Sequence, residues 1–392
     1  MPHRVSSGDD PYVGRVLDRQ FRVDAPIGSG AMARVYRAHQ VGVGRDVALK
    51  ILRPHLLERT EIVSRFRSEA ELVGKLTHPH VVAVHATGEI RDDATGNAGE
   101  PYVVLELLEG PSLAELLASA GGQLPTARAL HIVLALCDAV GEAHARGIVH
   151  RDLKPDNVML VRRGDDPDFV KLLDFGLARV LEERADPRTR AGSILGTPRY
   201  VSPEGAEGLP VTPASDCYAL ATLLYQCLAG RTPFEADSAV ALLALHSTAE
   251  PPDIRSWPAS AALPEPLARV IMQNLAKRPQ DRAADARALG RQLVDAARAI
   301  GIDAQEFGLS STLLGTRRDA AVSASLAQMA PAEPSALGPG LGTPKPERRR
   351  SPLRNASRAA LFVACFLMGV FAAVAIISRQ STPSSASTGN GR

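Results

Sequence analysis

The sequence predicts an α+β fold of two lobes, a small β-rich lobe at residues 15–107 and a larger α-helical lobe at residues 110–297. Strand-like apolar runs dominate the first region, and helical apolar periodicity dominates the second. Together the two regions have the size of one two-lobed globular body. A change of composition after residue 297 separates this body from the rest of the 392-residue chain.

The first lobe is expected to hold a small sheet and one helix. Residues 61–76 carry an imperfect apolar face, which is typical of a helix. The strands are expected at residues 21–27, 34–39, 47–52, 81–90 and 102–107.

The second lobe is expected to be mostly helical. Residues 126–146 place apolar side chains along one helical stripe. Shorter helices are expected at residues 215–229, 239–246, 267–275 and 284–297, and two strands at residues 158–160 and 170–173. A small β lobe followed by a larger α lobe leaves a cleft between them, where ligands often bind.

The overall composition excludes several classes of protein. The 45 basic and 43 acidic side chains balance, and 45% of the residues are hydrophobic, which excludes disordered, collagen-like and coiled-coil chains and gives no reason to expect nucleic acid as a partner. The four cysteines form no CxxC pair. This pattern predicts reduced core thiols, a cytosolic compartment for most of the chain and no zinc site.

The segments outside the folded body have distinct compositions. Residues 1–14 are polar, lack the apolar core of a signal peptide and are expected to be flexible. Residues 298–358 are rich in Ala, Pro, Ser and Gly, which predicts a disordered juxtamembrane linker. Residues 378–392 form a short Ser/Thr/Gly tail that is too small to fold.

Between linker and tail, residues 359–377 are apolar and uncharged. As a helix this segment spans about 28 Å, enough to cross a bilayer. The alternative, a buried core helix, needs a domain around it, whereas Pro, Ser, Gly and Arg flank this segment. The basic residues before it are Lys345, Arg348, Arg349, Arg350, Arg354 and Arg358, and those after it are Arg379 and Arg392.

This charge asymmetry predicts the topology of a single-pass protein of the cell membrane. The positive-inside rule places residues 1–358 in the cytoplasm and the C-terminal tail outside it. The lipid bilayer is therefore an expected partner. The basic cluster either fixes this topology alone or also binds anionic headgroups.

A glycine-rich turn connects the first two expected strands. Gly28 and Gly30 flank Ser29, and glycines let backbone N–H groups come close to an anion such as a phosphate. Glycine-rich hairpins are also common without any ligand. Ala33 stands where a G-x-G-x-x-G pattern has its third glycine, which weakens the pattern slightly.

One lysine in the first lobe is a candidate for phosphate binding, and one glutamate is its candidate partner. Lys50 ends the alternating run Val47-Ala48-Leu49-Lys50 on the third expected strand. Glu69, on the following helix, is the carboxylate that could hold this lysine in a cleft. The alternative is that both side chains are simply solvated.

The segment His150-Arg151-Asp152-Leu153-Lys154-Pro155-Asp156-Asn157 lies in an expected loop, and Asp174-Phe175-Gly176 follows the next strands. Asp174 and Asn157 offer the hard oxygen ligands that Mg²⁺ prefers. Asp152 is free to accept or orient a hydroxyl proton. Lys154 can neutralise charge that develops on a transferred phosphoryl group.

These strings, H-R-D-L-K-P-x-N and D-F-G, follow the glycine-rich loop, V-A-x-K and a helix Glu in one order. Over residues 15–297 the chain resembles the bacterial, eukaryotic-like serine/threonine protein kinases. The resemblance implies the two-lobed protein-kinase fold, ATP as phosphate donor and Mg²⁺ as cofactor, with Mn²⁺ as the alternative. It also implies protein Ser/Thr hydroxyls as acceptors, including the chain's own, and a homodimer for trans-autophosphorylation.

The resemblance assigns roles to matching positions. The catalytic residues would be Asp152, Lys154, Lys50 and Glu69, and the metal ligands Asn157 and Asp174. The ATP-binding residues would be Ile27, Gly28, Ser29, Gly30, Val35, Ala48, Lys50, Glu106, Leu108 and Met159. Of these, Ile27, Val35, Ala48 and Met159 would sandwich adenine, and backbone groups from Glu106 to Leu108 would bond its edge. Leu105 would be the gatekeeper, and Lys154 favours Ser/Thr over Tyr specificity.

The region after Gly176 is similar to the peptide-docking segment of the same family. The resemblance implies that Glu204 pairs with Arg282 and that Asp216 braces the loop of Asp152. Thr189 and then Ser193 are the candidate activation-loop phosphosites. Two other functions stay open, a catalytically inactive nucleotide-binding scaffold and a small-molecule phosphotransferase of related fold.

Overall fold

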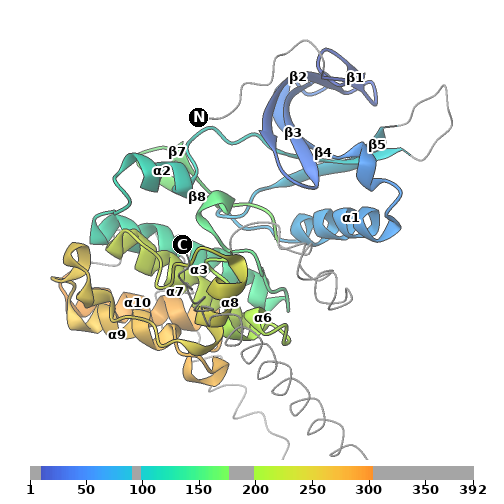
Figure 1. The fold of residues 1–392 in the computed structure, drawn as a ribbon. Coiled ribbons are helices and arrows are strands. Elements are labelled where there is room, and N and C mark those ends of the chain that lie inside the picture. Colours follow the sequence, from blue (N-terminus) through green and yellow to red (C-terminus); the bar gives the residue numbers. More distant parts are fainter. Residues whose placement is uncertain (1–9, 91–98, 176–197, 303–392) are drawn as a thin grey trace, which may run out of the picture. The chain divides into compact units, whose positions relative to one another are not determined.

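The computed structural model describes residues 10–90, 99–175 and 198–302, which form a β-rich lobe and a helical lobe (Figure 1). The two-lobed α+β fold predicted from the sequence is therefore confirmed. The predicted phosphosites Thr189 and Ser193 lie outside the described residues. So do residues 359–377, the predicted membrane span. Among the residues described, no helix has both the length and the apolar character that a membrane crossing requires.

The β-rich lobe contains an antiparallel six-stranded sheet with the order β1-β2-β3-β4-β6-β5. Its strands are β1 (Val16–Leu17), β2 (Phe21–Ser29), β3 (Ala33–Gln40), β4 (Arg45–Leu52), β5 (Val84–Ile90) and β6 (Glu100–Glu106). Helix α1 (Thr60–Gly74) follows a short 3₁₀ turn, η1 (Pro54–Leu56), and lies alongside the sheet (Figure 1). An apolar cluster that includes Leu52, Phe66 and Val103 fills the space between α1 and the sheet.

The helical lobe is built around α3 (Thr126–Ala145) and α7 (Pro213–Ala229). Both are buried around most of their circumference, as expected for helices in the centre of a lobe. The other helices are α2 (Leu113–Ser119), α6 (Pro203–Ala206), α8 (Ala239–Thr248), α9 (Glu265–Asn274) and α10 (Ala286–Ala299). A two-stranded ladder, β7 (Val158–Arg163) with β8 (Asp166–Leu172), and the 3₁₀ turns η2 (Pro155–Asn157), η3 (Ile254–Ser256), η4 (Pro258–Ser260) and η5 (Pro279–Asp281) complete it.

Two differences from the expected elements have simple physical reasons. The predicted strand 81–90 begins only at Val84, because Val82 donates its N–H to the carbonyl of Leu172 in the other lobe. Helix α2 was not predicted, although Ser112 and Glu115 form a capping box at its start. The sequence signal for this helix was present, since S-x-x-E precedes an apolar run.

The folded body extends beyond both of its predicted boundaries. The prediction of flexibility up to residue 14 is wrong for residues 10–14, because Tyr12 is buried and Asp10 accepts hydrogen bonds from Arg34 and Tyr36. The polar composition of this segment concealed these contacts. At the other end, α10 continues to Ala299, so the predicted linker cannot begin at residue 298.

The same apolar core joins the two lobes. Val73, Val81 and Val82 come from the first lobe but pack in the cluster of α3 and α7. The connection after β6 passes close to β7 at Gly110, whose φ is 156° and where an added Cβ would collide with the carbonyl oxygen of Leu160. Only glycine fits there, so the chain enters the second lobe along a fixed path. The cysteines at 137, 217 and 227 are buried free thiols, as predicted.

Candidate active site

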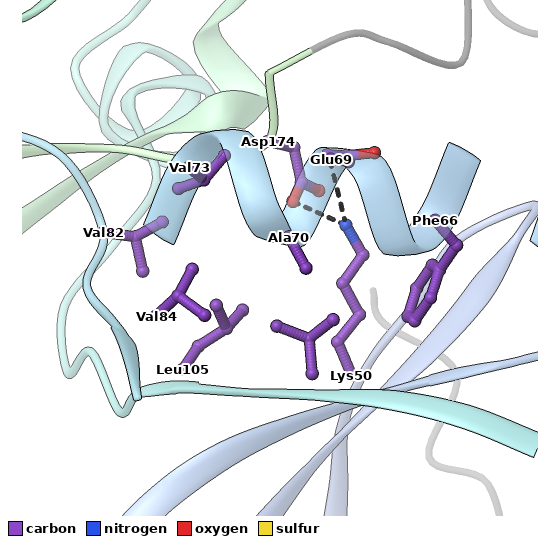
Figure 2. Close-up of a pocket in the computed structure, with 10 residues that line it drawn as sticks. Lys50, Phe66, Glu69, Ala70, Val73, Val82, Val84, Leu105 and Asp174 are labelled. Atoms are coloured by element: carbon purple, nitrogen blue, oxygen red, sulfur yellow. Dashed lines mark hydrogen bonds and ion pairs between the residues drawn. The ribbon is translucent and has the colours of Figure 1, made fainter. Parts of the chain in front are cut away.

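Lys50 lies at the centre of a charged cluster between β4 and α1. Its Nζ is 2.6 Å from Oδ1 of Asp174 and 3.7 Å from Oε1 of Glu69 (Figure 2). Helix α1 brings Glu69 to the sheet because Phe66, Ala70 and Val73 on the same helix are buried. The structure thus brings together three residues that lie far apart in the sequence.

The two carboxylates compete for one ammonium. Burial would lower the pKa of Lys50, but Asp174 and Glu69 together raise it above its usual value. Burial raises the pKa of Glu69 to about 7, against the opposing effect of Lys50. Although burial alone would raise the pKa of Asp174, the nearby Lys50 lowers it. Lys50 is therefore paired mainly with Asp174, and Glu69 is the weaker partner.

Asp174 occupies an uncommon backbone conformation directly after β8. Its φ is +34°, a region that residues other than glycine rarely adopt. The next side chain, Phe175, is buried, and its ring centroid is 4.5 Å from that of His150. His150 also approaches the carbonyl of Leu173 with its Nε2, at 3.1 Å. These contacts hold the turn and support a strained conformation at Asp174, which is a predicted metal ligand.

Asp152 lies in the loop between α3 and η2. Its Oδ2 accepts hydrogen bonds from Nζ of Lys154 at 2.6 Å and from Nδ2 of Asn157 at 3.0 Å. Asn157 also donates to the backbone carbonyl of Asp152 at 2.8 Å. The three side chains predicted to act in this loop are therefore in direct contact, and the carboxylate of Asp152 has a fixed orientation.

Asp216 on α7 holds the loop that contains Asp152, as the resemblance implied. Its carboxylate, which is 1% exposed, accepts the backbone N–H groups of His150 at 2.7 Å and Arg151 at 3.0 Å. His144 from α3 approaches the same carboxylate at 2.9 Å. A buried carboxylate with three partners is well satisfied. It fixes the backbone immediately before Asp152, including Arg151 at φ +69°.

The residues predicted to hold a metal suit Mg²⁺ by their chemistry. Asp174 contributes a carboxylate, and Asn157 keeps its Oδ1 as a ligand atom because its Nδ2 is bonded to Asp152. Mg²⁺ is usually bound by one or two protein oxygens together with phosphates and water. Within the described residues no cluster of three His, Cys, Asp or Glu could hold a metal on its own. The donor set therefore fits a metal that arrives with a phosphate ligand.

A groove connects the glycine-rich turn with the loop of Asp152. Ser29 and Gly30 line it on one side, and Asp152 and Lys154 line it on the other. Tyr200 from the segment after residue 197 also faces this groove. A phosphate held by the turn and a hydroxyl held by Asp152 would therefore share one space.

Ala33 fits the glycine-rich turn without blocking it. Its side chain is buried, and it packs with Leu52 and Phe66 in the cluster between the sheet and α1. The methyl group that replaces the third glycine is thus accommodated in an apolar core. The departure from the glycine pattern carries little weight against phosphate binding.

The residues predicted to contact adenine come from both lobes. Val35 and Ala48 lie on the neighbouring strands β3 and β4, whereas Met159 lies on β7 and bridges to Ser112. Ile27 is 51% exposed. The predicted gatekeeper, Leu105, lines a pocket with Lys50 and the charged cluster (Figure 2). The adenine contacts themselves stay a prediction.

Sequence reasoning missed two polar side chains near the site. Arg53 contacts the glycine-rich turn, and Lys171 donates to the carboxylate of Glu106 at 2.6 Å. Glu106 was expected to act only through its backbone. A lone lysine between Val170 and Leu172 in an apolar strand was a usable signal, whereas Arg53 follows a strand end and offered none.

The predicted contact between Glu204 and Arg282 is present. Both guanidinium nitrogens Nη1 and Nη2 donate to the Glu204 carboxylate at 2.9 Å, and the pair is buried. Ser215 adds a third hydrogen bond to Glu204 at 2.5 Å. This pair attaches α6 to the segment before α10.

Comparisons with known proteins agree with this geometry. Serine/threonine-protein kinase pkn3 of Myxococcus xanthus is 39% identical over 286 residues, which are 72% of this chain and 51% of that protein. Serine/threonine-protein kinase PrkC of Bacillus subtilis is 36% identical over 267 residues, 68% of this chain and 39% of that protein. The chain thus spans about half or less of the length of these curated relatives.

A solved structure and a family model extend the comparison to the fold. The crystal structure of the Mycobacterium tuberculosis PknI kinase domain is 27% identical, with a TM-score of 0.55, and the match covers 72% of this chain and 98% of that chain. The family model of the protein kinase domain matches residues 21–294. By this match, which covers both lobes and the charged cluster around Lys50, the chain belongs to the protein kinase domain family.

Proposed function

We propose that this protein is a serine/threonine protein kinase that transfers the γ-phosphate of ATP to Ser or Thr hydroxyls of proteins, including its own. One observation carries the proposal. The cluster of Lys50, Glu69 and Asp174 and the cluster of Asp152, Lys154 and Asn157 are both fully formed in one folded unit. The names of the similar proteins, which are serine/threonine kinases, support the choice of acceptor.

Each side chain has a role that its contacts support. Lys50 is a fixed cation for the phosphates of the nucleotide, and Asp152 is oriented to take the proton of the acceptor hydroxyl. Lys154, 2.6 Å from Asp152, stabilises negative charge on the transferred group. Asp174 and Asn157 would hold Mg²⁺ together with the phosphates, and the metal would supply further neutralisation of that charge.

The test is phosphate transfer by the purified full-length chain in detergent with labelled ATP, Mg²⁺ and a mixture of peptide acceptors. Label on Ser or Thr is expected, and it should fall at least a hundredfold in Lys50→Met and Asp152→Asn. The matched controls are Lys75→Met and Asp165→Asn, which change exposed residues of the same types. Both controls should keep full activity.

Two other functions predict different outcomes of this experiment. A nucleotide-binding scaffold would bind ATP with normal affinity and transfer no label. A small-molecule phosphotransferase would label metabolites in a cell extract and leave every protein and peptide unlabelled. Tyr200 and Asp152 line the same groove, and we propose that this groove receives the peptide that carries the acceptor hydroxyl.

We also propose that residues 359–377 anchor the kinase to the cell membrane, with the kinase domain in the cytoplasm and the C-terminal tail outside it. The uncharged segment and the excess of Arg before it support this topology. A reporter that is active only outside the cytoplasm, fused after Arg392, should be active. Activity of a cytosol-only reporter at this position would reverse the orientation, and recovery of the chain in the soluble fraction would exclude the anchor.

Activation is proposed to occur by trans-autophosphorylation in a homodimer, at Thr189 or Ser193. Arg151, which precedes Asp152, is the side chain that could receive a loop phosphate. Mass spectrometry after incubation with ATP should find phosphate at one of these two residues. Mixing active chain with Asp152→Asn chain should label the inactive chain if the transfer occurs between molecules.

A further inference from the structure

Arg53, the first residue after β4, makes three hydrogen bonds to the glycine-rich turn. Its backbone N–H donates to the carbonyl of Met32 at 2.9 Å. Its guanidinium donates through Nε to the carbonyl of Gly30 at 2.9 Å and through Nη2 to Oγ of Ser29 at 2.8 Å. One side chain therefore bonds the two consecutive residues at which strand β2 ends and the turn begins.

The rest of the turn is held by more local contacts. Gly30 donates its N–H to the carbonyl of Ala33 at 2.9 Å, which closes the turn on itself. The side chain of Met32 packs against the apolar cluster that contains Leu56 and Phe66. Neither contact involves Ser29, whose backbone lies opposite Arg34 in the ladder of β2 with β3. The guanidinium of Arg53 adds a direct side-chain link from Ser29 and Gly30 to the end of β4, the strand that carries Lys50.

The position of the turn matters for the proposed reaction. Ser29 and Gly30 line the groove that also contains Asp152 and Lys154. A shift of the turn would change the distance between its backbone N–H groups and any phosphate in that groove. Hydrogen bonds to an anion weaken quickly when their geometry is lost.

The charge of Arg53 is not used up by an ion pair. Within residues 10–90, 99–175 and 198–302, no carboxylate lies at ion-pair distance from its guanidinium, and both of its side-chain partners are neutral oxygens. A cation bonded to the turn raises the local positive potential where phosphates are expected. It also polarises the Gly30 peptide group, because the carbonyl accepts from a charged donor.

We propose that Arg53 is a positioning residue that clamps the glycine-rich turn over the groove and thereby sets the affinity of the site for the phosphates of the nucleotide. The inference rests on the proposed function in one respect, since it takes ATP as the ligand. It acts through Ser29 and Gly30 and leaves the adenine contacts unaffected. The clamp therefore distinguishes nucleotides with phosphates from the nucleoside.

The experiment measures binding of Mg²⁺–ATP, Mg²⁺–ADP and adenosine to the full-length chain in detergent by isothermal titration calorimetry. Arg53→Met should lower the affinity for ATP and for ADP about three- to tenfold, the range for loss of one or two hydrogen bonds. The affinity for adenosine should not change. The matched control is Arg59→Met, which changes an exposed arginine of the same lobe. It should change none of the three affinities.

A double-mutant cycle tests whether Arg53 acts through Ser29. Ser29→Ala alone should weaken ADP binding about twofold, and the double variant Ser29→Ala/Arg53→Met should bind ADP no more weakly than Arg53→Met alone. Additive effects of the two substitutions would show that Arg53 does not act through this hydrogen bond. Equal weakening of adenosine and ADP would show general damage to the lobe, and it too would overturn the clamp.

Arg53→Lys provides a second check. Lysine keeps the charge but can reach only one of the two acceptors, so ADP affinity should fall between those of wild type and Arg53→Met. If the wild-type chain binds ADP and transfers phosphate, but Arg53→Met binds ADP as tightly as Arg59→Met does, the clamp alone is refuted. Wild-type chain that neither binds ATP nor labels any acceptor would refute the proposed function.

Discussion

Two charge clusters of this protein, one around Arg282 and one around Lys50, are built in opposite ways. Arg282 and Glu204 face each other with two parallel hydrogen bonds of 2.9 Å. The remaining guanidinium donors go to backbone carbonyls, including those of Ala276 at 2.7 Å and Lys277 at 2.8 Å. Each guanidinium nitrogen of Arg282 therefore has a hydrogen-bond partner, and the side chain is fully buried.

The cluster around Lys50 is less completely satisfied. A single ammonium faces two carboxylates, at 2.6 Å for Asp174 and 3.7 Å for Glu69. The Asp174 side chain is 48% exposed, and its backbone is in a positive-φ conformation. The three charged groups of this cluster have few hydrogen-bond partners, whereas Arg282 and Glu204 have many.

The difference shows what each cluster is for. The pair of Arg282 and Glu204 has no hydrogen-bonding capacity left for a ligand. Its role is to attach α6 to the segment before α10. A cluster with one surplus carboxylate can rearrange when a cation or a phosphate enters. The contrast predicts that the same type of substitution has different consequences in the two places.

The largest effect on stability is expected for Arg282→Met. Loss of the arginine leaves the Glu204 carboxylate buried without its partner, which costs about 3–5 kcal/mol in free energy of unfolding. Urea denaturation followed by circular dichroism measures this change. The control is Arg298→Met, since Arg298 pairs with Asp295 on the exposed face of α10 and should contribute less than about 0.5 kcal/mol. A loss below 1 kcal/mol for Arg282→Met would show that the pair is not what fixes the chain.

Lys50→Met should cost less stability and much more activity. The two carboxylates that Lys50 contacts do not depend on it alone. Glu69 can take up a proton near pH 7, and Asp174 is half exposed to water. We expect a loss of about 1 kcal/mol in free energy of unfolding, together with a fall in phosphate transfer of a hundredfold or more. A loss of stability equal to that of Arg282→Met would remove the distinction between the two clusters.

The sequence predicts the parts of this protein that depend on local pattern. Periodicity placed α3, α7 and the strands β2 to β6 but not β1, and motif order predicts Lys50, Asp152, Asn157 and Asp174 as members of one site. Boundaries were less accurate where tertiary contacts decided them. Val82 bonds across to Leu172, and Tyr12 is buried by contacts far away in the sequence.

The contacts within the site could not be predicted in full, because they depend on which of two carboxylates lies closer to Lys50. Motif order pairs Lys50 with Glu69, whereas the structure places Asp174 closer. The distances follow from the positive-φ turn at Asp174 and the buried ring of Phe175, and the D-F-G string marks these residues without giving their conformation. Arg53 lies outside the motifs and becomes visible only through its contacts, whereas Lys171 could have been noticed as a lone lysine in an apolar strand.

The pH dependence of the reaction should report the weaker partner, Glu69. Burial raises its pKa to about 7, so Glu69 is mostly protonated at pH 6 and mostly charged at pH 8. When Glu69 is protonated, Lys50 has only Asp174 as a partner, and Asp174 is then less available to a metal. We therefore expect kcat/KM for ATP, which reports the free enzyme, to rise about tenfold from pH 6 to pH 8.

Glu69→Gln should abolish this rise, because glutamine does not titrate. The measurement is initial rates at low ATP concentration across that pH range for both proteins, with Asp165→Asn as a control for general pH effects. A profile in Glu69→Gln with the same inflection as wild type would assign the titration to another group.

The smallest effect is expected at a third pair, Lys171 and Glu106, which is intermediate between the two clusters. Lys171 donates to Oε1 of Glu106 at 2.6 Å, and the same oxygen accepts the N–H of Ala83 at 2.7 Å. Glu106 therefore keeps a partner when the lysine is lost. Lys171→Met should weaken adenosine binding only two- to threefold, the range for a partly exposed ion pair.

This pair also separates the two ends of the nucleotide. Glu106 belongs to the segment predicted to bond adenine, so Lys171→Met should weaken adenosine and ADP equally, whereas Arg53→Met should weaken ADP alone. Calorimetry with both ligands compares the two variants, and Lys75→Met, which changes an exposed lysine, is the control. Weakening of ADP without adenosine in Lys171→Met would place this lysine with the phosphates. In that case β8, which ends just before Asp174, would act on the metal side of the site and not on the adenine side.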